Sequence, residues 1–126
     1  MLLEPKSTNT GENLVFTGRL LAERGIPLEP AILVHKPYME RRTLATAGVQ
    51  WPGRRVIVTS PPIAFDAYPT ADISRDDLIH IMVGDLQRIR EYPARGWQTA
   101  QAMPAEVWEA AERLMALGYT RHLIRS

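Results

Sequence analysis

A polar loop near the start of the chain holds residues whose types could do chemistry. It reads Ser7-Thr8-Asn9-Thr10-Gly11-Glu12-Asn13 and lies between a short apolar run at residues 2–4 and apolar residues 14–16. The first run predicts the end of a strand and the second the start of a helix. A strand, a polar loop and a helix N-terminus together form the usual place in an α/β protein for an anionic or sugar-like ligand. The loop therefore predicts a polar small-molecule pocket, but it names no reaction.

Helix capping explains only part of this loop. Asn9, Thr10 and Asn13 can each cap a helix, and Asn9 with Glu12 has the spacing of a capping box. Capping uses one or two of these side chains, so we expect at least one of the others to contact a ligand. The candidates in and just before the loop are Glu4, Ser7, Thr8, Asn9, Thr10, Glu12 and Asn13.

A second group of candidates follows an apolar run at residues 31–35. Such a run is typical of a parallel strand that is buried on both faces. His35 ends the run, which favours a buried, hydrogen-bonded histidine; a ligand-facing or general-base role is the alternative. Lys36 is either a solvated loop lysine or a ligand contact.

Arg41 and Arg42 are predicted in the first turns of the next helix, where a cation opposes the helix dipole at a cost of about 0.3–1 kcal/mol. Two explanations remain open, and both can hold at once. Either Glu40, Glu4 or Glu12 forms a salt bridge with these arginines, or the arginines hold a carboxylate or phosphate, for which the guanidinium fork is well suited.

The composition limits the function classes. The 126 residues fit one domain, the formal charge of +1 gives no electrostatic case for nucleic acid, and the absence of cysteine excludes disulfides and thiolate chemistry. No His, Asp or Glu pair has convincing metal spacing. Neither a signal peptide nor a run of ~20 apolar residues is present, so we expect a cytoplasmic protein that is not inserted in a membrane.

The order of predicted elements alternates between strand and helix. We expect helices at residues 11–24, 37–47, 74–91 and 104–117, with strands ending at residue 4 and spanning 31–35 and 56–59. The spacing Ser74-x-x-Asp77 predicts that Ser74 caps the third of these helices. This order favours a parallel sheet. The loops at 4–13, 35–42 and 60–66 should then meet at one edge of the sheet, where open α/β sheets bind ligands.

The long helix at 74–91 carries one carboxylate beside its apolar stripe. Asp85 needs a partner there, and Arg88, one turn further on, is the local candidate for a structural ion pair. A role in the site is the alternative interpretation. His80 is expected on the opposite face of this helix, and His122 lies in the C-terminal tail.

Three segments carry a resemblance to a known family. They are Glu4-Pro5-Lys6-Ser7-Thr8-Asn9-Thr10-Gly11-Glu12-Asn13, Lys36-Pro37-Tyr38-Met39-Glu40-Arg41-Arg42 and Val83-Gly84-Asp85-Leu86-Gln87-Arg88-Ile89. Together they resemble the YdcF-like branch of the bacterial YdcF/SanA/ElyC superfamily, a domain of largely unknown function, across essentially the whole chain.

The resemblance implies a Rossmann-like, three-layer α/β/α domain with a short parallel sheet. It implies Glu4, Ser7, Asn9, Thr10, Glu12, Asn13 and Arg41 or Arg42 as site residues, and a nucleotide-like or adenosyl ligand such as S-adenosylmethionine. Family members begin with a further strand, a Ser-Gly-Gly loop and a helical region that this sequence lacks. We therefore expect the C-terminal half of the family domain, with an open sheet edge that promotes self-association.

Three hypotheses for function follow. The first is a domain that binds a nucleotide-type small molecule. The second is a transferase or hydrolase in which Glu4 or Glu12 is the general base and Arg42 stabilises developing charge. The third is a non-catalytic remnant that acts through protein contacts. Buried carboxylates with a raised pKa would favour the enzyme, and an exposed apolar sheet edge would favour the remnant.

Overall fold

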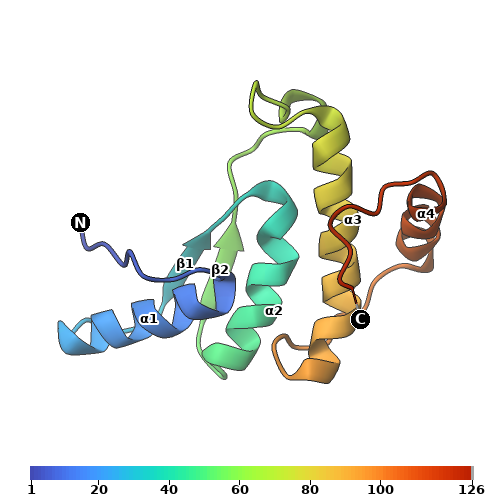
Figure 1. The fold of residues 1–126 in the computed structure, drawn as a ribbon. Helices are drawn as coiled ribbons and strands as arrows, with labels where there is room; N and C mark the ends of the chain where they lie inside the picture. Colours follow the sequence, from blue (N-terminus) through green and yellow to red (C-terminus); the bar gives the residue numbers. More distant parts are fainter. Residues whose placement is uncertain (126) are drawn as a thin grey trace.

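The computed structural model describes residues 1–125 and shows a mixed α/β fold. Within these residues a two-stranded sheet lies beside four helices (Figure 1). The elements in chain order are α1 (Thr10–Glu23), β1 (Ala31–Val34), α2 (Glu40–Gln50), β2 (Val56–Thr59), α3 (Arg75–Glu91) and α4 (Ala105–Ala116). Three short 3₁₀ turns flank these helices. η1 (Pro37–Met39) precedes α2, η2 (Phe65–Ala67) precedes α3, and η3 (Tyr92–Arg95) follows α3.

The two strands run parallel, as the alternating order predicts. Ala31 pairs with Val56 and Val34 with Thr59, so the register is in step over all four residues. The connection from β1 to β2 passes through η1 and α2, which is the crossover that a parallel pair requires. Both strands therefore end on the same side as the start of α2.

Only one face of the sheet is covered within residues 1–125. Leu14 of α1 and Ala47 and Trp51 at α2 form a buried cluster, onto which the inward strand residues Ala31, Leu33 and Val56 pack. The alternate residues point outward, and Ile32, Val34 and Ile57 are 68%, 67% and 66% exposed. The prediction that the strand at 31–35 is buried on both faces is wrong, because no described element packs against the outer face.

One predicted strand is absent from residues 1–125, and one predicted helix has different bounds. Residues 2–4 are not a strand, since their backbone has no neighbouring strand with which to form a ladder. The helix predicted at 37–47 begins with a 3₁₀ turn and continues past Gly48 to Gln50. Gly48 does not end the helix but lets a loop approach it closely: a Cβ there would lie 2.6 Å from the Thr99 methyl carbon.

The C-terminal part of the chain packs around α3. Ser74 caps α3 by accepting a hydrogen bond from the Asp77 amide, as predicted, and Leu78 and Val83 are almost fully buried. His80 was expected on the opposite face but is 6% exposed, because the C-terminal tail covers it and the Arg121 amide donates to its Nδ1 atom. Within residues 1–125 no helix has the length and apolarity to cross a bilayer.

Candidate functional site

A cavity lies where the loop before α1, the segment after β1 and the middle of α3 meet. It has a volume of about 560 Å³. We call it the cationic cavity because Lys36, Arg42 and Arg88 line it together with two histidines. The full lining is Ser7, Thr8, Asn9, Thr10, Asn13, His35, Lys36, Tyr38, Met39, Arg42, Ile81, Asp85, Arg88 and His122.

Hydrogen bonds within the loop fix its shape at the start of α1. Asn9 accepts from the Glu12 amide at 2.8 Å, which confirms the predicted cap. The Glu12 carboxylate reaches back to the amide and hydroxyl of Thr8 (2.9 and 2.8 Å) rather than to Asn9. The Ser7 hydroxyl donates to the Asn13 side chain at 2.6 Å. The loop thus presents its hydroxyls and amides at the cavity in a fixed arrangement.

The two glutamates proposed as general bases are poorly placed for that role. Hydrogen bonds from Thr8 hold the pKa of Glu12 below its usual value. Slight desolvation would raise the pKa of Glu4, but hydrogen bonds from Ser7 and Lys6 outweigh it and the net shift is downward. Glu4 lines a separate surface hollow beside Leu3 and Phe16, and Glu12 faces the cavity adjoining the cationic one. A lowered pKa makes a carboxylate a weaker base.

Arg42 forms a part-buried ion pair with Asp85 that links α2 to α3. Its Nη1 atom lies 2.7 Å from Asp85 Oδ1, and the two side chains are 17% and 9% exposed. The expected salt bridges from the arginines to Glu40, Glu4 or Glu12 and from Asp85 to Arg88 are therefore wrong. The sequence spacing favoured local partners, whereas helix packing brings residues 43 positions apart into contact.

The Arg42–Asp85 pair still has unused hydrogen-bonding capacity. Arg42 Nε and Asp85 Oδ2 are buried and have no hydrogen-bond partner within residues 1–125. Burial raises the pKa of Asp85, although the charge of Arg42 opposes that shift. Unpaired buried polar atoms are costly, and both residues that carry them line the cationic cavity.

Arg88 positions the C-terminal tail against the cavity. Its Nη1 atom donates to the carbonyl oxygens of Gly84 and His122, at 3.0 and 2.7 Å. A Cβ at Gly84 would lie 2.6 Å from the His122 carbonyl oxygen, so only glycine lets the tail lie this close to α3. Sequence reasoning missed Arg88 and His122 as cavity residues. The glycine before Asp85, in the middle of a long helix, was the available signal for a close approach.

His35 and Lys36 follow β1, and both line the cavity. His35 is half-buried, and its Nδ1 atom accepts from the Lys36 amide at 2.7 Å. Desolvation, helped by the nearby charges of Lys36 and Arg42, lowers the pKa of His35, so the ring is mainly neutral at pH 7. Arg41 lies outside the cavity, where its side chain donates to Gln101 at 3.4 Å.

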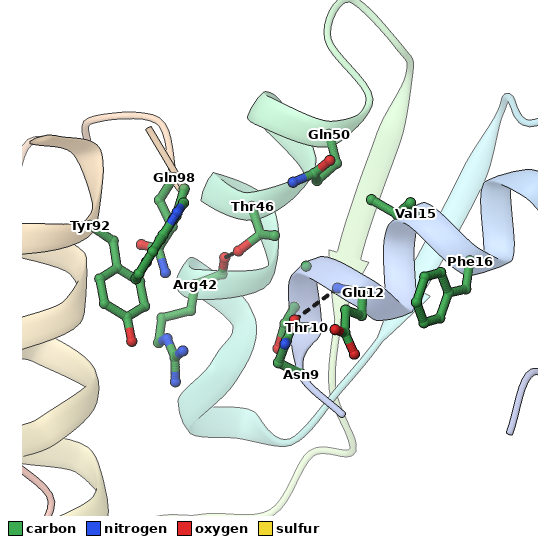
Figure 2. A pocket seen from close by; sticks show the side chains of 12 residues that line it. Asn9, Thr10, Glu12, Val15, Phe16, Arg42, Thr46, Gln50, Tyr92 and Gln98 are labelled. Atoms are coloured by element: carbon green, nitrogen blue, oxygen red, sulfur yellow. Dashed lines mark hydrogen bonds between the residues drawn. The ribbon is translucent and has the colours of Figure 1, made fainter. Parts of the chain in front are cut away.

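A second cavity adjoins the first and shares Asn9, Thr10 and Arg42 with it (Figure 2). Its volume is about 430 Å³, and we call it the aromatic cavity. Figure 2 shows Arg42 on α2 between the start of α1 and the side of the cavity formed by Tyr92 and Gln98. The lining is Asn9, Thr10, Gly11, Glu12, Val15, Phe16, Arg42, Thr46, Gln50, Tyr92, Trp97 and Gln98.

The loops at 4–13 and 35–42 meet as predicted, although only the second of them follows a strand. The loop at 60–66 lines neither of these cavities. Ile63 and Phe65 instead border a small apolar hollow of about 170 Å³ with Tyr38 and Tyr68. Among residues 1–125 no group of three His, Cys, Asp or Glu side chains could hold a metal ion.

Comparison with known proteins finds similarity to an uncharacterized protein of Streptomyces coelicolor. The two are 35% identical over 124 residues, which is 98% of this chain and 56% of the relative. The chain thus spans little more than half the length of the curated relative it matches. No family model matches the sequence. No solved structure shows significant similarity to it.

Proposed function

We propose that this chain is a small-molecule-binding domain that holds an anionic, nucleotide-type ligand in the cationic cavity. The fold that we propose for it is the YdcF-like, Rossmann-like α/β/α arrangement, of which the parallel pair β1–β2 and the helices on its inner face are one part. The ligands to which the family resemblance points are nucleotides and S-adenosylmethionine.

The observation that carries the proposal is the grouping of cations at the start of α1. Lys36, Arg42 and Arg88 come from the segment after β1, from α2 and from α3, and line one cavity in which Asp85, the partner of Arg42, is the one lining carboxylate within residues 1–125. The first amides of α1 lie beside them, and a helix N-terminus favours an anion. The protein as a whole has a formal charge of only +1, so this concentration of positive charge is local to the cavity.

The buried atoms that lack a partner also support a ligand at this place. Arg42 Nε is an open donor to a phosphate or carboxylate oxygen, and Asp85 Oδ2 is an open acceptor for a hydroxyl or ammonium group. A phosphorylated sugar or an amino acid moiety carries both kinds of group. S-adenosylmethionine carries a carboxylate and an ammonium, and a nucleotide carries a phosphate and ribose hydroxyls.

Calorimetric titration with ATP and with S-adenosylmethionine tests the proposal. We expect binding of at least one of them, weakened about tenfold or more by Lys36→Gln, since a charged contact contributes about 1.5–3 kcal/mol. Lys36 is exposed, so its replacement should leave the fold intact. Arg90→Gln is the matched control, because Arg90 lies on α3 outside the cavity and bonds Glu112. If the wild-type chain binds neither ATP nor S-adenosylmethionine, the proposal is contradicted.

A second candidate function is catalysis of group transfer or hydrolysis, favoured by one observation. Asp85 is a buried carboxylate at the cavity whose pKa is raised by desolvation, which is the property expected of a general acid or base. This assigns the role to Asp85 in place of Glu4 or Glu12. Turnover of a bound nucleotide that Asp85→Asn abolishes, while binding persists, would establish it.

A further inference from the structure

We infer that the aromatic cavity is the base subsite of the ligand, built to take an amino-substituted purine such as adenine. The inference rests on the proposed function, because the phosphate or other charged group of the same ligand would occupy the cationic cavity. The two cavities share Arg42, Asn9 and Thr10, so one elongated molecule can extend from one into the other.

The aromatic side chains come from η3 and the loop that follows it. Tyr92 and Trp97 pack edge to face, with ring centroids 5.0 Å apart, and both line the cavity. Trp97 remains 51% exposed despite its size. A rigid, half-exposed indole at the wall of a cavity is a surface on which a planar heterocycle can stack.

Gln98 supplies a recognition group beside these rings. Its side chain lines the cavity, the residue is 4% exposed, and its Oε1 atom is buried without a partner within residues 1–125. A buried acceptor of this kind calls for an N–H donor. An exocyclic ring amine provides that donor, and a glutamine amide can pair with the N–H and ring nitrogen of adenine in two hydrogen bonds.

The loop that carries Gln98 is held rigidly against α2. The Thr99 amide donates to the Ala45 carbonyl oxygen at 2.9 Å, and the Gln101 side chain donates to the Arg41 carbonyl oxygen at 2.8 Å. Gly48 permits this contact, as described above. Gln98 is thus fixed in place before any ligand arrives, which reduces the entropy lost on binding.

Three 5′-phosphates separate the contributions: AMP, purine riboside 5′-monophosphate without the exocyclic amine, and ribose 5-phosphate without a base. We expect AMP to bind about 10-fold more tightly than purine riboside monophosphate and at least about 100-fold more tightly than ribose 5-phosphate. Gln98→Met should reduce AMP affinity to that of purine riboside monophosphate and leave ribose 5-phosphate unchanged. Arg90→Gln, on α3 and outside both cavities, is the control and should change none of the three affinities.

We expect these variants to fold like the wild type. Methionine at position 98 removes an unpaired buried polar atom without a large change in volume, and circular dichroism checks the fold. Trp97→Leu at the half-exposed position is a second variant, expected to weaken both purine nucleotides but not ribose 5-phosphate. Equal affinity for all three phosphates, or AMP affinity unchanged in Gln98→Met, overturns the inference alone. If neither AMP nor ribose 5-phosphate binds, the assignment of the cationic cavity to a nucleotide is overturned as well.

Discussion

Separating Arg42 from Asp85 should show how strongly one buried contact joins α2 to α3. Arg42 Nη1 lies 2.7 Å from Asp85 Oδ1, and the two side chains are 17% and 9% exposed. Removing one member of a fully buried pair costs about 3–5 kcal/mol, and the partial exposure of Arg42 lowers our expectation to about 2–4 kcal/mol for Arg42→Met or Asp85→Leu alone. For a domain of this size that corresponds to a fall in melting temperature of roughly 8–16 °C.

The double variant shows whether the two single losses come from one shared contact. Combining Arg42→Met with Asp85→Leu replaces both charges with apolar side chains, so no unpaired charge stays buried. We expect it to be at least as stable as either single variant, which requires a coupling of about 2 kcal/mol or more in urea unfolding. The exposed pair Arg75–Asp66 is the control, and Arg75→Met should cost less than about 1 kcal/mol. Additive losses within about 0.5 kcal/mol would refute the account of a shared buried contact.

Three further predictions concern the packing of the C-terminal tail, the loss of stability at acid pH and self-association through the sheet. Gly84→Ala should destabilise the protein by about 1–3 kcal/mol in urea unfolding, because its Cβ would lie 2.6 Å from the His122 carbonyl oxygen; an unchanged midpoint would count against the packed tail. The pKa of Asp77 is lowered, first by its hydrogen bond from Arg121, so its stabilisation is present above the unfolded value of about 3.8 and lost as the pH falls through the lower folded value. Urea unfolding at pH 6 and pH 3 should therefore show a smaller acid loss in Asp77→Asn than in the wild type, and equal losses would argue against this linkage. The wild-type chain should self-associate through the exposed sheet face, and Ile32→Thr with Ile57→Thr should lower its light-scattering mass towards the monomer value; a wild type that is already a clean monomer would disprove this.

Local patterns predicted the elements well. The cap at Asn9, the cap at Ser74 and the apolar strands at 31–35 and 56–59 each depend on residues within a few positions of one another, and all were confirmed, whereas the strand predicted to end at residue 4 was wrong. Parallel pairing also followed from the order of elements. The prediction failed where burial depends on what packs against an element. Residues 31–34 have the composition of a doubly covered strand, but within residues 1–125 only one face is covered.

The candidate site was predictable only in part for a similar reason. The loop before α1 and the residues after β1 meet as expected, although in the described part of the chain the strand predicted to end at residue 4 is absent and only β1 contributes a strand end. The partner of Arg42 could not, because Asp85 is 43 residues away and the contact depends on how α2 packs against α3. His122 and Gln98 lie in segments without periodic patterns. Gly84 signals that some segment approaches α3 closely, but it does not say which one, and no comparable signal points to Gln98.

Mapping the binding site by NMR tests the central claim most directly. Amide chemical shifts of the ¹⁵N-labelled chain, followed during titration with AMP, report which residues the ligand affects without any substitution. We predict saturable shifts at Thr10 and Lys36 around the cationic cavity and at Gly11 and Gln98 in the aromatic cavity, with the amides of α4 unaffected. Shifts that do not saturate, or that fall on α4 and the outer sheet face instead, would contradict the assignment of this site.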